Sequence, residues 1–172
     1  MNRRVIMDFE KLIDERYTVR SFKGKKVEDE LVNKILEAGR KAPSAMNKQP
    51  YKLYVCTSLD ALNKIDMVSP CRYGAPLAII VAGSESDAWS KDGYSSYDTD
   101  LSICTTYMML ESANLGLGSV WVGMFDTAKA KELFNIEYTP IAILMIGYKN
   151  DGVGPLSSHS SRKELKDLVT YL

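Results

Sequence analysis

The spacing of apolar residues over the first third of the chain predicts two helices, a strand and a third helix. Helical spacing runs from Asp8 to Arg16 and, more clearly, from Val27 to Ala42, where Pro43 ends it. Apolar and polar positions alternate from Tyr51 to Thr57, which indicates a strand. Ser58 precedes the next helical pattern and is expected to cap that helix.

Continuous apolar runs farther along the chain indicate strands buried on both faces. Leu77 to Gly83 and Ile141 to Gly147 are runs of this kind, and Ser119 to Val122 is a shorter strand. A helical pattern between them begins at Thr99 and is apolar almost all round, which predicts a central helix buried by its neighbours. Gly116 and Gly118 are expected to end this helix.

The remaining segments are predicted as a loop, a helix and a C-terminal helix or tail. Ser84 to Tyr97 is polar and is expected to be a loop. Thr127 is expected to cap a helix from Ala128 to Phe134, and Arg162 to Val169 forms the C-terminal helix or tail. Because no repeat or linker divides the sequence, we expect one domain over residues 1–172, of the α+β or α/β class.

Composition and charge narrow the classes of partner. The chain has 22 basic and 22 acidic residues, so no broad cationic surface for nucleic acid is expected. This balance conceals a basic N-terminal third, with 13 basic against 8 acidic residues from Met1 to Lys52. The apolar runs are too short to span a bilayer, and no apolar segment of a signal peptide follows the basic start from Met1 to Ile6. We therefore expect a cytoplasmic protein without a membrane partner.

The cysteines indicate a reduced protein without a metal site. Cys56, Cys71 and Cys104 lie far apart and form no CxxC pair, which argues against a disulfide framework and a closed zinc site. We expect buried or half-buried thiols, with Cys71 the most accessible because it follows Ser69-Pro70 in a predicted loop.

The usual catalytic signatures are absent. The sequence has no GxGxxG after a strand, no P-loop, no GxSxG and no HExxH. Its one histidine, His159, lies in a Ser-rich stretch and is expected to be a solvated surface residue rather than a general base. An enzyme with so few catalytic side chains would take its reactivity from a cofactor.

Two segments carry groups that suit such a ligand. The first runs from Glu15 to Phe22 and places Arg16 and Arg20 four residues apart, with Thr18 between them. Guanidinium groups hold anions through charge-assisted bidentate bonds, although these arginines could equally be surface residues paired with Asp14 and Glu15.

The second segment joins a helix to a strand between Pro43 and Pro50. It carries Ser44, Asn47 and Gln49, whose neutral side chains can donate and accept hydrogen bonds to a polar heterocycle. The alternative is an ordinary connecting turn, in which the same residue types are common.

Together these segments resemble the nitroreductase family of FMN-dependent NAD(P)H oxidoreductases. The family has an Arg-x-Ser/Thr-x-Arg/Lys-x-Phe segment followed by a Pro-Ser-Ser-x-Asn-x-Gln-Pro loop. Asn114 to Gly123 is similar to the end of its central helix and the Gly-Leu-Gly turn, and Arg162 lies where the family has a basic residue near the flavin phosphate. The resemblance implies an α+β fold with helices around a central, mainly antiparallel sheet, and an intertwined homodimer.

The resemblance also implies the residues that bind FMN. Those on the phosphate side would be Arg16, Tyr17, Thr18 and Arg162, while Arg20 would approach the N1 and C2 edge of the flavin ring. The partner subunit would contribute Pro43, Ser44, Ala45 and Asn47. Trp121, Val122 and Gly123 would lie along the ring, with the Gly123 N–H directed at N5. No side chain would act as a catalytic group of its own.

This chain departs from the family pattern at several positions. Ala45 replaces the second Ser of the loop, Gly123 stands where some members are acidic, and Ser160 stands where some are basic. Phosphate neutralisation would then depend on Arg16 and Arg162. The chain is also shorter than many members, so the substrate side would be open or covered by the segment from Ser84 to Tyr97.

The implied reaction is ping-pong transfer of hydride from NADH or NADPH through FMN to a nitroaromatic, a quinone or a free flavin. A specialised reaction on the same fold, such as dehalogenation or flavin destruction, is one alternative. A flavin-binding module that senses redox state or stores cofactor is another, and an α+β interaction protein without a cofactor is a third.

Overall fold

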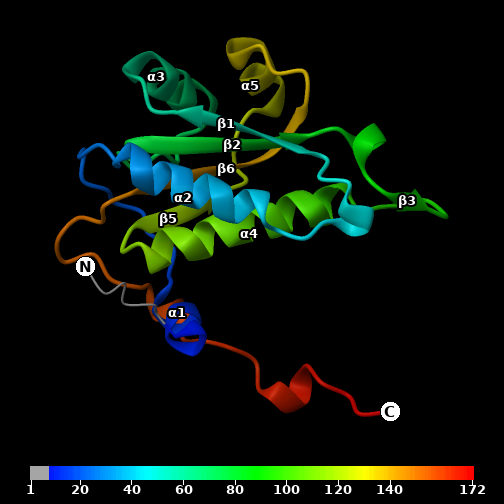
Figure 1. The fold of residues 1–172 in the computed structure, drawn as a ribbon. Helices are drawn as coiled ribbons and strands as arrows, with labels where there is room; N and C mark the ends of the chain where they lie inside the picture. Colours follow the sequence, from blue (N-terminus) through cyan, green and yellow to red (C-terminus); the bar gives the residue numbers. More distant parts are fainter. Residues whose placement is uncertain (1–7) are drawn as a thin grey trace.

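A four-stranded antiparallel sheet lies between two layers of helices in the computed structural model, which describes residues 8–172 (Figure 1). The strands follow the order β1 (Tyr51–Cys56), β2 (Leu77–Gly83), β6 (Thr139–Gly147) and β5 (Gly118–Val122), and all neighbouring strands are antiparallel. The basic start of the chain, with the prediction made on it, lies outside the described residues.

The two central strands are buried on both faces, as their continuous apolar runs predicted. Every residue of β2 is buried, and its side chains alternate between two hydrophobic cores. Ile80 belongs to the core on one side of the sheet, whereas Ile79 belongs to the core on the other side. Helices on both faces thus explain why an antiparallel strand lacks the usual polar positions.

The helices divide between the two faces of the sheet (Figure 1). One layer contains α3 (Leu59–Val68) and α5 (Thr127–Phe134), and the other contains α2 (Asp29–Arg40) and α4 (Tyr97–Asn114). Ser58 caps α3 as predicted, its Oγ accepting the Ala61 N–H at 3.2 Å.

Two helical predictions need correction. The cap of α5 is Asp126 rather than Thr127, because its carboxylate accepts the Lys129 N–H at 2.9 Å and suits the positive end of the helix. The central helix α4 is buried only on the side that faces α2 and the sheet. Tyr107, on its other side, is exposed.

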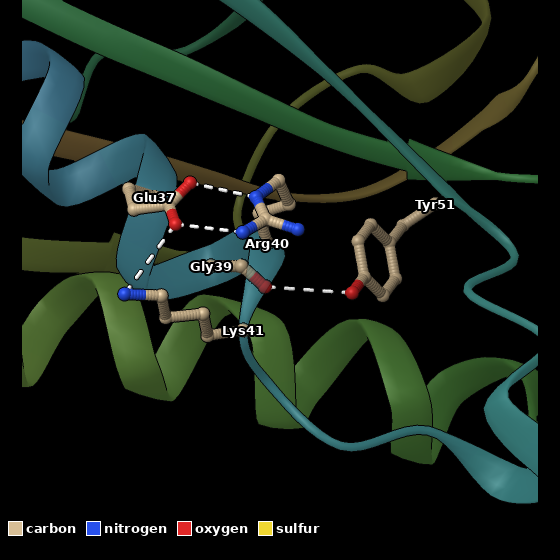
Figure 2. Close-up of polar contacts among 5 residues, drawn as sticks. All are labelled: Glu37, Gly39, Arg40, Lys41 and Tyr51. Carbon is tan, nitrogen blue, oxygen red and sulfur yellow. Dashed lines mark hydrogen bonds and ion pairs between the residues drawn. The ribbon is translucent and has the colours of Figure 1, made fainter.

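Helices α2 and α4 approach closely at Gly39. A Cβ atom there would lie 2.8 Å from Met108 Cγ, so a glycine is needed for this contact. Figure 2 shows how the end of α2 is joined to the first residue of β1: the Tyr51 hydroxyl donates to the Gly39 carbonyl oxygen at 3.4 Å. In the same turn Glu37 accepts two hydrogen bonds from Arg40, at 2.6 and 2.7 Å. The hydrogen bond from Tyr51 to Gly39 therefore ties together the two ends of the connection from α2 to β1.

The segment predicted as a loop between β2 and α4 contains a small hairpin. Strands β3 (Ser90–Lys91) and β4 (Tyr94–Ser95) are joined by Asp92 and Gly93, both with positive φ. An Asp-Gly pair is a strong hairpin signal, but the polar flanks hid it. The hairpin projects from the body of the molecule (Figure 1).

Helix α1 (Phe9–Glu15) and the C-terminal segment both lie below the sheet (Figure 1). The helix packs beside the C-terminal segment, which then extends away from the body (Figure 1). That segment has no α-helix and forms only a short 3₁₀ turn over Leu165–Asp167, so of the two alternatives predicted for it the tail is correct. Among the described residues no helix is both long and apolar enough to cross a membrane.

Candidate functional site

A cavity of about 420 Å³ lies where the chain leaves α1 and crosses the end of α4 and the start of β5. This volume is within the range of small-molecule sites, about 300–1,000 Å³. Its wall consists of Leu12, Asp14, Glu15, Arg16, Tyr17, Val19, Ala113, Gly116, Leu117, Gly118, Ser119, Lys149, Pro155 and His159. Two predicted site residues, Arg16 and Tyr17, are thus in one cavity.

Backbone pairing with β5 places the segment that carries these residues. Thr18 forms a parallel bridge with Ser119, and the Val19 N–H donates to the Ser119 carbonyl oxygen at 3.0 Å. Gly118 permits this approach, because a Cβ there would lie 2.6 Å from Val19 Cγ2. The glycine-rich turn after α4 therefore sets the position of Arg16 and Tyr17.

Two cationic side chains in the wall of this cavity are not engaged in ion pairs within the described part of the chain, although Asp14 and Glu15 line the same cavity. Within residues 8–172, neither Arg16 nor Lys149 forms a salt bridge, and Glu15 pairs with Lys11 at 3.6 Å. Lys149 Nζ lies 5.2 Å from the centre of the Tyr17 ring, and the Tyr17 hydroxyl donates to the Val153 carbonyl oxygen at 2.8 Å. The alternative of surface arginines paired with Asp14 and Glu15 is not what the structure shows for Arg16.

His159 was expected to be solvated, but it is half-buried in the wall of this cavity. Its Nε2 lies 3.1 Å from the Asp14 carbonyl oxygen, and its ring meets the Tyr17 ring edge-on, with 6.2 Å between their centres. The Ser-rich stretch is held against α1 by these contacts, which its sequence does not reveal.

Arg162 lines an adjoining cavity of about 550 Å³. The two cavities share Asp14 and His159, and the Arg162 Nη1 donates to the Ser161 carbonyl oxygen at 2.8 Å. The structure thus brings Arg162 near the Arg16 cavity through the contact between His159 and Asp14, which are 145 positions apart in the sequence.

Sequence reasoning missed Lys149 and His159 as members of the site. Lys149 follows β6 and forms an isolated antiparallel bridge with Phe22, so it reaches the cavity only through the tertiary fold. No local motif marks either residue.

Arg20 lies apart from this cavity, exposed and beside the Tyr73 hydroxyl. A hydrogen bond with the Cys71 thiol and burial raise the pKa of Tyr73, while Arg20 acts in the opposite direction. The prediction for the cysteines is confirmed: all three are buried, and Cys71, at 9% exposed, is the most accessible of them. Its turn packs against the core, and the Cys71 N–H donates to Ser69 Oγ at 3.2 Å.

The predicted ring-side residues lie along β5, which is an edge strand of the sheet. The Val122 side chain is buried in the core beneath α3 and α5, so this residue can offer a ligand only its backbone. Trp121 is half-buried, and its side chain points to the opposite face of the strand. At Gly123 a Cβ atom would meet nothing within 4 Å, which leaves open space beside the backbone.

The predicted loop residues Pro43, Ser44, Ala45 and Asn47 lie at the other end of α4. The Ala45 N–H donates to Asp100, which lies in the first turn of α4. The Arg16 cavity is instead lined by Ala113, which lies in the last turn of α4. At 1.5 Å of rise per residue, these two positions are about 20 Å apart along the helix. One copy of the chain therefore does not bring this loop to the Arg16 cavity.

Comparison with known proteins gives the same fold and an extended match in sequence. The model of the nitroreductase family matches residues 13–71 and 68–148. A protein of Methanothermobacter thermautotrophicus named "Putative NADH dehydrogenase/NAD(P)H nitroreductase" is 32% identical over 159 residues, which are 86% of this chain and 81% of that protein.

Two solved structures illustrate the likeness of the fold. A nitroreductase family protein from Clostridium difficile 630 is 36% identical and has a TM-score of 0.88, with 96% of this chain and 98% of that chain covered. A protein from Exiguobacterium sibiricum 255-15, described as "a putative nitroreductase in complex with FMN", shares the fold at 19% identity, with a TM-score of 0.84 and 96% and 98% of the two chains covered. The α+β prediction is thereby confirmed, and the chain belongs to the nitroreductase family.

Proposed function

We propose that this protein is an FMN-dependent oxidoreductase that oxidises NADH or NADPH and reduces an electron-poor acceptor such as a nitroaromatic, a quinone or a free flavin. The observation that carries the proposal is the cavity at Arg16 and Tyr17, which the family motif marks and which presents unpaired cations. Family membership, and the FMN complex described for the structure from Exiguobacterium sibiricum, support it.

The residues at the cavity fit the phosphate end of FMN. Arg16 offers a planar guanidinium that can bind two phosphate oxygens, and Lys149 offers a second positive charge. Arg162, from the adjoining cavity, offers a third. Thr18, paired with Ser119 beside them, can donate a hydroxyl hydrogen bond. Some family members have a basic residue at the position of Ser160, and Lys149 would supply the positive charge that is missing there.

The end of β5 fits the flavin ring. The open space beside Gly123 lets the ring approach the backbone, and the Gly123 N–H would point toward N5. Trp121 would lie along the ring, and Val122 would contribute only main-chain atoms. Arg20 would supply a fixed positive charge to stabilise negative charge at the N1 and C2 edge. When bound, FMN would supply the hydride carrier of a ping-pong reaction, taking hydride from NAD(P)H before the acceptor enters the same place.

A homodimer would complete the site. Because the loop from Pro43 to Asn47 lies at the far end of α4 from the cavity, a second copy is needed to bring it to the flavin ring. Apolar side chains are exposed on α1, on α4 and along the C-terminal segment, where a second copy would cover them. They include Phe9, Ile13, Tyr107, Leu165, Leu168 and Tyr171.

The absorption spectrum of the purified protein tests this function. We expect bound flavin, or uptake of added FMN, and bleaching of the oxidised flavin band by NADH or NADPH without oxygen. A colourless protein that takes up no FMN would contradict the proposal. Bound FMN that neither NADH nor NADPH reduces would favour a flavin-binding module instead. Light scattering should give twice the mass of the chain.

Substituting the phosphate-side cations tests the placement of FMN. Arg16→Ala and Arg162→Ala should weaken FMN binding while leaving riboflavin binding unchanged, because riboflavin has no phosphate. If both variants bind FMN as tightly as the wild type, the phosphate lies elsewhere.

A further inference from the structure

The loop between α2 and β1 holds an unusual backbone. Met46, Asn47 and Gln49 all have positive φ, of 52°, 55° and 49°. This left-handed region is unfavourable for residues that carry a Cβ, and such residues cluster at functional sites. The Met46 side chain is 76% exposed, so burial of that side chain does not hold the backbone in place.

Hydrogen bonds within the loop support part of this conformation. The Gln49 N–H donates to Ser44 Oγ at 3.0 Å, and the Gln49 side-chain amide donates to Asn47 Oδ1 at 3.2 Å. The base of the loop is closed by the bond from Tyr51 to Gly39 (Figure 2). These contacts shape the loop, but they do not attach its tip, residues 44–47, to the body of the protein.

The contact that joins the tip to the body comes from Asp100. This carboxylate lies in the first turn of α4 and is only 2% exposed. Its Oδ1 accepts the Ala45 N–H at 2.9 Å, and its Oδ2 accepts the Ser96 hydroxyl at 2.8 Å. A negative charge in this turn is also stabilised by the dipole of α4. A buried carboxylate thus uses both oxygens to join the loop to the segment that enters the helix.

The same carboxylate connects the loop to the β3–β4 hairpin. The Ser96 N–H donates to the Trp89 carbonyl oxygen at 2.8 Å, and the Tyr94 hydroxyl lies 3.2 Å from the Thr99 hydroxyl. The loop, the hairpin and the start of α4 therefore meet at Asp100.

We propose that Asp100 is a positioning residue, which holds the backbone of residues 44–47 in the conformation that meets the flavin ring across the dimer interface. The inference rests on the proposed function. Because the Ala45 N–H is engaged by Asp100, the ring is left to the Ser44 hydroxyl and the Asn47 side-chain amide. Loss of the carboxylate frees the tip, and binding must then order it again.

Flavin titrations of three variants test the proposal. Asp100→Ala removes both acceptor oxygens, whereas Asp100→Asn keeps an oxygen for the Ala45 N–H. Ala45→Pro removes the N–H and places the ring Cδ toward the carboxylate, so the bond to Asp100 is broken while Asp100 itself is kept. The backbone accepts proline here because Ser44 is extended, with ψ of 155°, and residue 45 begins a 3₁₀ turn. Asp98→Ala is the matched control, since Asp98 is exposed and lies in the same turn of α4.

Flavin fluorescence gives the Kd of the apoprotein for FMN and for riboflavin. We expect Asp100→Ala and Ala45→Pro to raise both Kd values by a similar factor, on the order of tenfold, which is the usual effect of losing a hydrogen bond to a charged group. Asp100→Asn should restore most of the affinity, and Asp98→Ala should bind as the wild type does. Arg16→Ala, by contrast, should affect FMN alone.

Several outcomes would overturn the inference. Unchanged Kd values in Asp100→Ala and Ala45→Pro would do so, and so would a loss confined to Asp100→Ala, because the bond to Ala45 would then not be the cause. If Asp100→Ala does not fold, Ala45→Pro decides the question. A wild-type protein that binds neither flavin would remove the proposed function and this inference together. Wild-type binding of both flavins by the variants would remove the inference alone.

Discussion

Replacing Gly118 by alanine should disturb the cavity from within the protein. The new Cβ would lie 2.6 Å from Val19 Cγ2, 2.9 Å from Val19 Cβ and 3.0 Å from Val19 Cγ1. Carbon atoms in contact prefer about 3.5–4.0 Å, so the segment that carries Val19 must move by about 1 Å. Val19 is buried and bonded to β5 through Ser119, so the shift must be taken up by the backbone.

The cost has a component in stability and a component in binding. Overpacking of this kind reduces the free energy of unfolding by about 1–3 kcal/mol. For a chain of this length each kcal/mol lowers Tm by roughly 2–4 °C. Arg16 and Tyr17 precede Val19 and would move with it. Loss of a charge-assisted hydrogen bond from Arg16 to phosphate would cost about 1.5–3 kcal/mol, or roughly 10- to 150-fold in the Kd for FMN.

Urea denaturation of the apoprotein and FMN titration measure the two components separately. Gly24→Ala is the matched control, because a Cβ at Gly24 would meet nothing within 4 Å. Adding Val19→Ala to Gly118→Ala should recover part of the lost stability, since both Cγ contacts disappear while the Cβ contact stays. If Gly118→Ala unfolds and binds FMN as Gly24→Ala does, the close contact does not position the Arg16 segment.

Three further results are expected. Gly123→Ala should leave the stability of the apoprotein unchanged but weaken FMN binding by about tenfold, because its Cβ enters the space proposed for the ring; unchanged binding would place the ring elsewhere. Burial raises the pKa of Cys56 to about 11 and that of Cys104 to about 12. At pH 8 their thiolate fractions are about 10⁻³ and 10⁻⁴, so iodoacetamide should label them slowly in the native protein and fast in urea, as mass spectrometry can show; fast native labelling of Cys104 would contradict its burial. A hydrogen bond from Arg40 lowers the pKa of Glu37 from 4.5 to about 2. Because the folded-state pKa is the lower one, Glu37 stabilises the fold above pH 4.5, and this contribution is lost as the pH falls toward 2. Glu37→Gln should therefore show a weaker dependence of the urea midpoint on pH over this range, and an unchanged dependence would contradict the assignment.

Sequence patterns predicted the framework well where burial was uniform along an element. The runs at Leu77 and Ile141 became the two central strands, since only strands covered on both faces lack polar positions. The hydrophobic pattern gave wrong predictions where a few polar residues next to an element determine its structure. At the hairpin, the polar flanks concealed the Asp92-Gly93 turn, and at α5 the carboxylate of Asp126 took the cap from Thr127.

The candidate site was predictable only where its residues are contiguous in the chain. Arg16 and Tyr17 belong to one short motif, and they line one cavity. Lys149 and His159 reach the same cavity from other segments, and no local sequence pattern indicates such tertiary contacts. Likewise, the bond from Asp100 to Ala45 joins residues 55 positions apart.

The separation of the Arg16 cavity from the Pro43–Asn47 loop, at opposite ends of α4, has a genetic consequence. In a symmetric dimer, each proposed site takes its cations from one subunit and its loop from the other. A chain with Arg16→Ala and a chain with Ala45→Pro would each be defective, but a mixed dimer would carry both lesions in one site and neither in the other. Co-expression in equal amounts should thus restore about a quarter of the wild-type sites, by random pairing. Arg16→Ala and Arg162→Ala both alter the adjoining cavities of one subunit, so these two variants should fail to complement each other.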